Sequence, residues 1–400
     1  MPLDAVLASP ALQGASVGAC VTTRDGRTVY RHNAGLRLTP GSNEKLVSCS
    51  YALHTLGPDY RTSTRFWKRG DTLVIGAPGD PLLTHEQLQQ AAKTLGIDYA
   101  KVQVREAYHP GYPGSWEWDD LPNRYAAPVV SLCFDQGAFE LWSNQGQPEL
   151  VPGSFGIGVA YQQAATKVKS TYDPIRGTLQ IVGQLPSTKQ RIERFALPRP
   201  DEAAASLFGK SFERIAEVPT DKPDLVIESK PLRETVKACL QPSDNLIAEN
   251  LLMIATTREK TFADPYEQAR QGETRFLTEV VGIPKRDFEV DDGSGESRHN
   301  MVTARMLAKL LRWADKQPTR QVWRQALATP GVGTLQNRLI GLQFQGKTGT
   351  LDMSVALSGY IRTRSGRTLV ASVIVNNFSS SANQIRSIVD RFMGLVAKSD

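Results

Sequence analysis

The sequence has few cysteines and no long apolar run. Its longest apolar stretch, Leu369–Val375, has the length of a strand, whereas a membrane-spanning helix needs about 20 apolar residues. The four cysteines, Cys20, Cys49, Cys133 and Cys239, form no C-x-x-C pair, which argues against a disulfide scaffold or a cysteine-ligated zinc site. We interpret them as free, buried thiols, and one disulfide stays open if the compartment is oxidising.

Patterns for binding metals and nucleic acids are also missing. The five histidines lack metal-ligand spacing, because no second histidine follows four positions after His85, the one that precedes a glutamate. We therefore expect no metal ion and no other cofactor. The 47 basic residues are interspersed with 41 acidic ones, which gives a formal net charge of +6 without a basic block. This argues against nucleic acid as a partner, whereas a mild positive balance suits a polyanionic cell wall.

The N-terminus does not have the pattern of a signal peptide. Met1 to Asp4 contain neither a basic region nor the start of a long apolar stretch. Either the protein is cytoplasmic, or a signal peptide has been removed and Met1 is an expression start. The motifs described below favour the second interpretation. We expect a periplasmic or cell-envelope protein whose signal peptide is absent from this sequence, and the oligomeric state stays open.

Both ends of the chain combine hairpins with helices. Two β-rich runs, Ala15–Thr23 and Thr28–Tyr30, flank Asp25-Gly26, which is a strong turn signal for a hairpin. A second hairpin is predicted for Val355–Arg362 and Thr368–Asn376. Apolar periodicity predicts helices over five segments: Ser42–Leu56, Pro231–Leu240, Leu246–Thr257, Thr303–Lys316 and Asn383–Val396.

The middle of the chain has a different style. Between about residues 64 and 222, short β-like runs alternate with Gly and Pro, and few long helical patterns occur. A chain of 400 residues is long enough for two or three domains. The predicted fold is an α+β domain, an antiparallel sheet with a helical subdomain, built from residues 1–63 and 223–400. A β-rich insertion of two subdomains, residues 64–222, interrupts it.

Three short motifs occur in order along the chain. They are S-N-E-K at residues 42–45, S-D-N at 243–245 and K-T-G-T at 347–350. The patterns S-x-x-K, S-D-N and K-T-G together are typical of penicillin-binding proteins and class A β-lactamases. Each motif is weak by itself, but S-x-x-K and K-T-G each occur once here, and all three stand in the expected order.

The first motif has the chemistry of an activated serine. Residues three apart share a helix face, so Ser42 and Lys45 are expected to point the same way from one helical turn. A serine hydroxyl becomes a good nucleophile when a neighbour takes its proton. A lysine can do so only when neutral, a form that burial and a second cation favour; Lys347 is the expected second cation. The alternative is Ser42 as a helix cap beside a solvated lysine.

The second motif follows Pro242 and lies between two predicted helices. Such a turn can present Ser243 and Asn245 to the same site, while Asp244 points the other way. Ser243 is expected to relay a proton to the leaving amine, and Asn245 to hold Lys45 and a substrate amide. The alternative is a plain loop with a helix cap.

The third motif precedes a hairpin and predicts an edge strand, residues 346–350. A substrate can add to such an edge as an extra strand, and Gly349 would let a ligand backbone approach closely. We expect Lys347 and Thr348 to bind a C-terminal carboxylate, and the backbone N–H groups of Ser42 and Thr350 to form an oxyanion hole. The alternative is an ordinary turn lysine.

Over nearly its whole length the sequence resembles the D-alanyl-D-alanine carboxypeptidase/endopeptidase family, the low-molecular-mass class C penicillin-binding proteins. Besides the three motifs, the matching segments are Gly76–Pro81, Trp116–Asp120, Tyr125–Pro128, Ser243–Glu249, Asp292–Arg298, Gly333–Leu335 and Leu357–Tyr360. One departure stands in the segment that is similar to the family's D-G-S-G-L-S-R: Glu296 replaces the usual apolar residue.

The resemblance implies a serine transpeptidase/β-lactamase-like domain interrupted, between the first two motifs, by β-rich inserted domains. It also implies active-site roles for Ser42, Lys45, Ser243, Asn245, Lys347 and Thr348. By the same match, Asp120 is an insertion-domain aspartate that faces the amine of the substrate's side chain. The 201 positions that separate Ser42 from Ser243 argue against a class A β-lactamase, in which this gap is far shorter.

The predicted function is therefore that of a serine DD-peptidase. It would cleave D-Ala-D-Ala termini, D-Ala cross-links of peptidoglycan, or both, through an acyl-Ser42 intermediate, and β-lactam antibiotics would inhibit it by acylating the same serine. One alternative is a β-lactamase or esterase on the same scaffold. The other is a peptidoglycan-binding protein that keeps the cleft but not the chemistry. The balance of carboxypeptidase and endopeptidase activity and the third stem-peptide residue stay open.

Overall fold

The computed structural model describes residues 2–258, 260 and 262–399, which form two compact units. The terminal unit contains residues up to Tyr60, residues 231–256 and residues from Tyr266 onward, and the inserted unit contains 61–230 and 257–265. The inserted unit extends beyond residue 222 because strand β14 (Leu225–Glu228) pairs with β4 (Ser63–Arg69).

The terminal unit contains both ends of the chain. Its helices are α1 (Pro2–Leu7), α2 (Lys45–Leu56), α5 (Leu232–Leu240), α6 (Asn245–Thr257), α7 (Pro265–Arg275), α8 (Ala304–Ala314), α9 (Arg320–Ala326) and α10 (Ala382–Val396). Its strands are β1 (Ser16–Thr23), β2 (Thr28–His32), β3 (Arg37–Leu38), β15 (Phe288–Glu289), β16 (Met301–Thr303), β17 (Phe344–Leu351), β18 (Ser354–Arg362) and β19 (Thr368–Asn376). The two predicted hairpins are present as β1–β2 and β18–β19.

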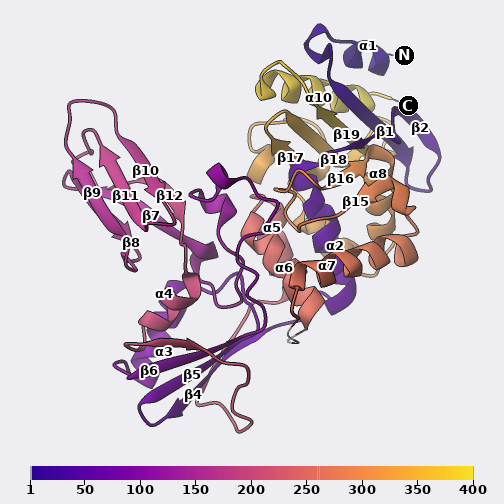
Figure 1. The fold of residues 1–400 in the computed structure, drawn as a ribbon. Coiled ribbons are helices and arrows are strands. Elements are labelled where there is room, and N and C mark those ends of the chain that lie inside the picture. Colours follow the sequence, from indigo (N-terminus) through magenta and orange to yellow (C-terminus); the bar gives the residue numbers. More distant parts are fainter. Residues whose placement is uncertain (1, 259, 261, 400) are drawn as a thin grey trace. The chain divides into compact units, whose positions relative to one another are not determined.

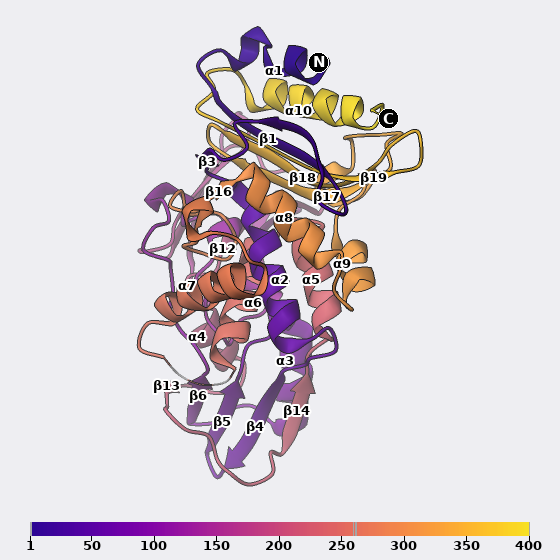
Figure 2. The same cartoon turned by 90° about the vertical axis from the view of Figure 1, so that its right-hand side faces the viewer.

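A five-stranded antiparallel sheet organises this unit, in the order β17-β18-β19-β1-β2. The N-terminal strand β1 pairs along its whole length with β19, from Ser16 opposite Asn376 to Thr23 opposite Leu369, so it joins the two ends of the chain. Helices α1 and α10 cover one face of the sheet and α8 lies on the other (Figure 2). Because β17 has a sheet partner on one side only, it is the edge strand that the sequence predicted.

Local sequence explains where the helices of this unit begin. Ser381 caps α10 by accepting a hydrogen bond from the backbone N–H of Gln384, as a serine before a helix commonly does. Leu46 and Cys49 of α2 are fully buried, in keeping with the predicted apolar spacing. The helix predicted from Ser42 starts with a 3₁₀ turn, Gly41–Glu44, and continues as α2 from Lys45. Ser42 therefore lies on a tight turn just before the α-helix.

The inserted unit is rich in strands, as predicted. It contains β4, β5 (Thr72–Ala77), α3 (His85–Leu95), β6 (Lys101–Glu106), β7 (Ala138–Asn144), β8 (Gln147–Val151), β9 (Gly158–Gln162), β10 (Lys169–Asp173), β11 (Thr178–Val182), β12 (Gln190–Ala196), α4 (Pro200–Ser206), β13 (Phe212–Arg214) and β14. Its sheets have the orders β13-β6-β5-β4-β14, β12-β7-β8 and β10-β11-β9. One apolar core reaches across all three sheets.

Two helices accompany the first of these sheets, and Figure 1 shows α3 and α4 beside it. The sequence analysis did not single out α3, although its start carries a capping box: the Thr84 side chain accepts from the Gln87 N–H, and the Gln87 side chain accepts from the Thr84 N–H. Among the described residues, no helix is long and apolar enough to cross a membrane.

Candidate active site

The first motif places a serine hydroxyl beside a fully buried lysine. Ser42 is half-buried on the 3₁₀ turn, whereas Lys45, at the start of α2, is 0% exposed. Lys45 Nζ lies 2.8 Å from Ser42 Oγ, so the two side chains point toward each other, as the spacing predicted. A buried lysine must be held by polar partners, since an unpaired charge in the interior is costly.

Lys45 has two further partners. Its Nζ lies 2.6 Å from Asn245 Oδ1 and 2.7 Å from the backbone carbonyl oxygen of Ser294. Both are carbonyl oxygens, which can only accept, so each takes one N–H of the lysine. In the neutral amine, the remaining lone pair is then directed at the hydroxyl of Ser42. The arrangement can therefore accept the Ser42 proton without moving a heavy atom.

The second and third motifs together form another pair of a serine hydroxyl and a buried lysine. Lys347 Nζ, which is also 0% exposed, lies 2.7 Å from Ser243 Oγ and 2.8 Å from the backbone oxygen of Thr348. Burial lowers the pKa of Lys347 well below its ordinary value of 10.5, and the charge of Lys45 lowers it further. Two buried lysines, each beside a serine hydroxyl, thus belong to one site.

The turn between α5 and α6 holds Ser243 in an uncommon conformation. Its φ of +69° lies in the left-handed region, which costs a non-glycine residue about 1 kcal/mol. Asp244 Oδ1 accepts the N–H of Ile247 at 3.0 Å and so caps the start of α6. Asp244 thereby serves the helix, and its neighbours Ser243 and Asn245 bind the two lysines.

Strand β17 passes directly beside the serine turn. A side chain at Gly41 would place its Cβ 2.9 Å from the Thr350 nitrogen, so the absence of a side chain at Gly41 brings that strand against the residue before Ser42. The structure gives a second reason for a glycine at Gly349, because a Cβ there would lie 2.2 Å from the Pro40 carbonyl oxygen; the approach of a ligand stays a prediction. The Thr348 hydroxyl donates to Thr334 Oγ1 at 2.8 Å, and Thr350 is exposed.

Two contributors to the site were not assigned a role from the sequence, and both lie on the loop 292–297. The Ser294 carbonyl binds Lys45, and Glu296 Oε2 accepts from Asn245 Nδ2 at 2.8 Å. No side-chain pattern points to a backbone carbonyl, so the role of Ser294 had no signal in the sequence. Glu296 had one, because it breaks the family pattern at this position.

Buried carboxyl groups hold this loop in place. Asp292 accepts the N–H groups of Gly295 and Ser297, each at 2.7 Å. Glu249, on α6, accepts the N–H groups of Gly293 and Ser294 at 3.1 and 2.7 Å. Each of these hydrogen bonds fixes the backbone that presents the Ser294 carbonyl.

These carboxyl groups belong to a larger buried acidic cluster formed by Glu44, Glu249, Glu273 and Asp292. Burial, followed by the charge of Asp292, raises the pKa of Glu249 to about 8 and raises that of Glu44 well above its ordinary value. Burial likewise raises the pKa of Glu273. A carboxyl group with a raised pKa keeps its proton at neutral pH, so the cluster is less negative than its residue types imply.

Asp120 lies in the inserted unit, on a 3₁₀ turn, Trp118–Asp120. It is half-buried, and its Oδ1 accepts the hydroxyl of Tyr125 at 2.6 Å. Asp120 and Tyr125 come from the two neighbouring segments that resemble the family's insertion motif. Its predicted role toward the substrate stays a prediction.

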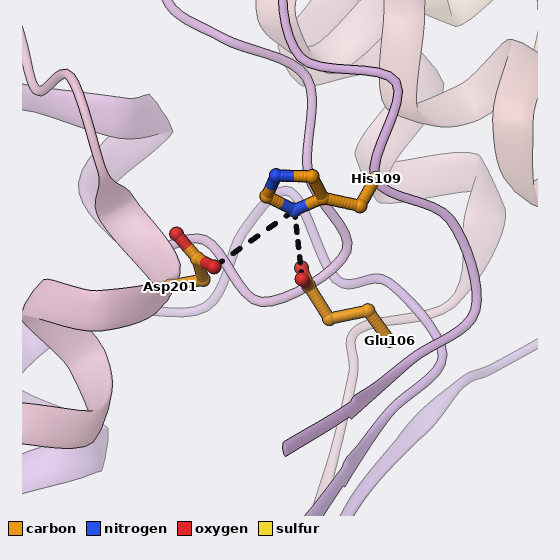
Figure 3. A group of neighbouring side chains, drawn as sticks. All are labelled: Glu106, His109 and Asp201. Atoms are coloured by element: carbon orange, nitrogen blue, oxygen red, sulfur yellow. Dashed lines mark hydrogen bonds and ion pairs between the residues drawn. The ribbon is translucent and has the colours of Figure 1, made fainter. Parts of the chain in front are cut away.

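Two groups with metal-ligand chemistry lie in the described part of the inserted unit: the exposed to half-buried carboxylates Glu117, Asp119 and Asp120, and the group Glu106, His109 and Asp201 (Figure 3). His109 Nδ1 lies 2.7 Å from Glu106 Oε2 and 3.8 Å from Asp201 Oδ2. Arg214 already pairs with both carboxylates, 3.3 Å from Glu106 and closer still to Asp201. The hydrogen bond to Glu106 raises the pKa of His109. These contacts describe a network of opposite charges, because the ligand atoms are already committed to cations.

Comparison with known proteins gives relatives over almost the whole chain. The D-alanyl-D-alanine carboxypeptidase of Actinomadura sp. (strain R39) is 28% identical, covering 95% of this chain and 81% of its own length. The D-alanyl-D-alanine carboxypeptidase DacB of Haemophilus influenzae is 22% identical, covering 92% and 87%. The crystal structure of penicillin binding protein 4 (dacB) from Haemophilus influenzae matches with a TM-score of 0.84 at 19% identity, over 100% of both chains.

The likeness to that crystal structure confirms the predicted fold class, and the relatives confirm the family resemblance. The profile of the D-Ala-D-Ala carboxypeptidase 3 (S13) family matches residues 1–398. The chain therefore belongs to the D-Ala-D-Ala carboxypeptidase 3 (S13) family and is a serine-type peptidase, as its motifs predicted.

Proposed function

We propose that this protein hydrolyses D-alanyl-D-alanine termini and D-Ala cross-links of peptidoglycan through an acyl-Ser42 intermediate. The observation that carries the proposal is the set of contacts around Lys45, whose Nζ lies 2.8 Å from Ser42 Oγ while two carbonyl oxygens take its other N–H groups. This arrangement suits a base that removes the Ser42 proton.

Acylation begins with attack of Ser42 Oγ on the carbonyl carbon of the penultimate D-Ala. Lys45 accepts the hydroxyl proton as the new C–O bond forms. The backbone N–H groups of Ser42 and Thr350 would hold the developing oxyanion. The close approach of Gly41 to the Thr350 nitrogen supports this assignment, because it brings the two N–H groups into one neighbourhood.

Ser243 and Lys347 would serve the leaving amine. The Ser243 hydroxyl, 2.7 Å from Lys347 Nζ, can pass a proton to the amine nitrogen as the peptide bond breaks. Thr348, together with Lys347, would bind the terminal carboxylate of the substrate, which adds along the free edge of β17 past Gly349. Water then hydrolyses the acyl-enzyme and restores Ser42.

The proposed partners follow from this reaction. Peptidoglycan stem peptides are the substrates, and β-lactams inhibit by acylating Ser42. Peptidoglycan chemistry places the protein outside the cytoplasm, and we propose the periplasm or cell envelope. Asp120 is proposed to bind the amine of the third stem residue, which its carboxylate could recognise as an ion pair.

Release of D-alanine tests the proposal. The protein is incubated with a peptide that ends in D-Ala-D-Ala, and in parallel with a cross-linked muropeptide dimer, and the products are separated by chromatography. We expect cleavage in at least one assay and none after Ser42→Ala. Cleavage that survives this substitution would contradict the assignment of the nucleophile.

The same preparation separates the alternatives. A β-lactamase would hydrolyse many equivalents of a chromogenic cephalosporin per protein molecule, whereas the proposed peptidase becomes acylated by about one. A binding protein would retain peptidoglycan on a pull-down assay and cleave neither substrate. The intact set of Ser42, Lys45, Ser243, Asn245 and Lys347 supports the peptidase.

A further inference from the structure

Glu296 extends the hydrogen-bond chain that starts at the nucleophile. Asn245 stands in the middle of it: its Oδ1 accepts from Lys45 Nζ at 2.6 Å, and its Nδ2 donates to Glu296 Oε2 at 2.8 Å. Lys45 in turn contacts Ser42 at 2.8 Å. Glu296 is thus hydrogen-bonded to the side chain that holds Lys45.

The orientation of the Asn245 amide decides how Lys45 can act. With Oδ1 toward Lys45, the amide takes one N–H of the lysine and leaves the lone pair of the neutral amine for the Ser42 proton. If the amide were turned by 180°, Nδ2 would face Lys45 and donate to that same lone pair. The lone pair would then be occupied, and Ser42 would lose its base.

A carboxylate on the far side of the amide selects between these two orientations. It can only accept hydrogen bonds, so it pairs with Nδ2 and is repelled by Oδ1. An apolar side chain at position 296 would make no such distinction. We propose that Glu296 is a positioning residue that holds the Asn245 amide with its oxygen toward Lys45. This inference rests on the proposed role of Lys45 as the base for Ser42.

The loop 292–297 places Glu296 firmly enough for this role. Asp292 accepts the N–H of Gly295 on one side of Glu296 and that of Ser297 on the other, each at 2.7 Å. Gly295 has a φ of +80°, and a Cβ there would lie 2.0 Å from the Gly41 carbonyl oxygen, so the loop is held directly against the serine turn. The backbone that carries the Glu296 side chain is therefore fixed on both sides of this residue.

Acylation kinetics test the proposal through three substitutions. The second-order rate constant for acylation of Ser42 by benzylpenicillin is measured for the unaltered protein, Glu296→Leu, Glu296→Gln and the control Glu289→Leu, which alters an exposed glutamate on β15. We expect a loss of about tenfold for Glu296→Leu, the value of one hydrogen bond to a charged group. Glu296→Gln should lose about as much, because its amide can accept from Nδ2 or, with the Asn245 amide turned, donate to Oδ1, and so no longer selects one orientation. Glu289→Leu should leave the rate unchanged.

Two outcomes of this series would overturn the proposal. One is an unchanged rate in Glu296→Leu. The other is an unchanged rate in Glu296→Gln, which would mean that a group able only to accept hydrogen bonds is not needed at this position. Thermal unfolding of each variant accompanies the kinetics, and a merely structural role would lower the melting temperature and the rate together.

A second background removes the choice of orientation altogether. Asn245→Asp replaces the amide with a carboxylate, whose two oxygens are equivalent. Glu296 can then no longer select between two orientations of the side chain at position 245. In that background Glu296→Leu should no longer lower the acylation rate, and relief of repulsion between two carboxylates can even raise it. The same tenfold loss in both backgrounds would contradict an action through the amide.

A neutron crystal structure shows the orientation of the Asn245 amide directly, independently of any acylation measurement. Deuterium on the Asn245 amide distinguishes Nδ2 from Oδ1. We expect Oδ1 toward Lys45 in the unaltered protein and both orientations in Glu296→Leu; Nδ2 toward Lys45 in the unaltered protein would overturn the proposal. If the unaltered protein formed no adduct on Ser42, the proposed function would fail, and this structure would still decide the role of Glu296.

Discussion

Two cation networks, one in each unit, have partners of different charge. In the terminal unit, Lys45 and Lys347 lie within 2.8 Å of hydroxyl and carbonyl oxygens, which carry no net charge. In the inserted unit, Arg214 lies against the carboxylates of Glu106 and Asp201 (Figure 3). Of these two networks, the second pairs opposite charges directly and the first does not.

The difference shows how a fold separates chemistry from structural support. A carboxylate partner stabilises the charged form of a cation and so keeps it protonated. Hydroxyl and carbonyl partners hold a lysine in place and stabilise its charged form less than a carboxylate does. A cation needed for proton transfer is therefore best held by neutral oxygens, and a cation that joins elements is best paired with carboxylates.

The largest effect is expected at the base itself. Lys45→Met removes the amine but keeps the length of the side chain, so acylation by benzylpenicillin should fall at least about a thousandfold. The melting temperature should fall by a few degrees at most, because the buried apolar side chain offsets part of the cost of leaving the Asn245 and Ser294 oxygens without this donor. Lys285→Met, at an exposed position, is the control and should change neither. A large loss of stability in Lys45→Met would contradict the contrast drawn above.

Lys347 should have the next largest effect. Its pKa is lowered by burial and by the charge of Lys45, so its proton is available for relay through Ser243. Lys347→Met should slow acylation by about a hundredfold and leave the protein folded. Stopped-flow measurement with a chromogenic cephalosporin gives the rate. An unchanged acylation rate in Lys347→Met would contradict a role for Lys347 in the proposed proton relay.

The opposite pattern is expected in the inserted unit. Arg214→Met leaves Asp201, 1% exposed, and Glu106 with His109 as their remaining partner in this network, and it should lower the free energy of unfolding by about 2 kcal/mol, reduced from the buried case because the guanidinium is 43% exposed. Penicillin acylation of the folded variant should not change. Denaturant unfolding and the acylation rate are both measured. Slower acylation at unchanged stability would contradict the comparison.

The smallest effect concerns the acidic cluster and pH. The pKa of Glu249 is raised from 4.5 to about 8, so the folded state keeps a proton that the unfolded state loses. The contribution of Glu249 to the free energy of unfolding is then fully present below pH 4.5 and is lost as the pH rises through about 8. Glu44, buried in the same cluster, has a raised pKa as well. Glu44→Gln should reduce the fall of the melting temperature between pH 6 and 9 by a few degrees, as seen by calorimetry; an equal or steeper fall would contradict it.

Much of the site could be predicted from the sequence because the three motifs are local. The three-residue spacing of Ser42 and Lys45 fixes their mutual orientation on one turn. Pairs of β-rich runs separated by turn residues such as Asp25-Gly26 predicted the two hairpins that become β1–β2 and β18–β19. The order of the motifs then identified the family, and the profile match confirms it.

The rest depends on contacts between segments far apart in the chain. The Ser294 carbonyl reaches Lys45 across 249 positions, and a backbone oxygen leaves no trace in residue identity. The close approach of the Pro40 carbonyl to Gly349, which also requires a glycine, was likewise invisible in the sequence. Helix α3 was missed because its short amphipathic run lies among strands, although Thr84 and Gln87 mark its start.

Mass spectrometry of the intact protein after mixing with benzylpenicillin, with peptide mapping of the adduct, tests the central claim most directly. The account predicts one penicillin on Ser42 that persists for minutes or longer, and no adduct in Ser42→Ala. An adduct on another residue would contradict the proposed nucleophile. Hydrolysed drug without an adduct would indicate a β-lactamase, and intact drug without an adduct would indicate a binding protein.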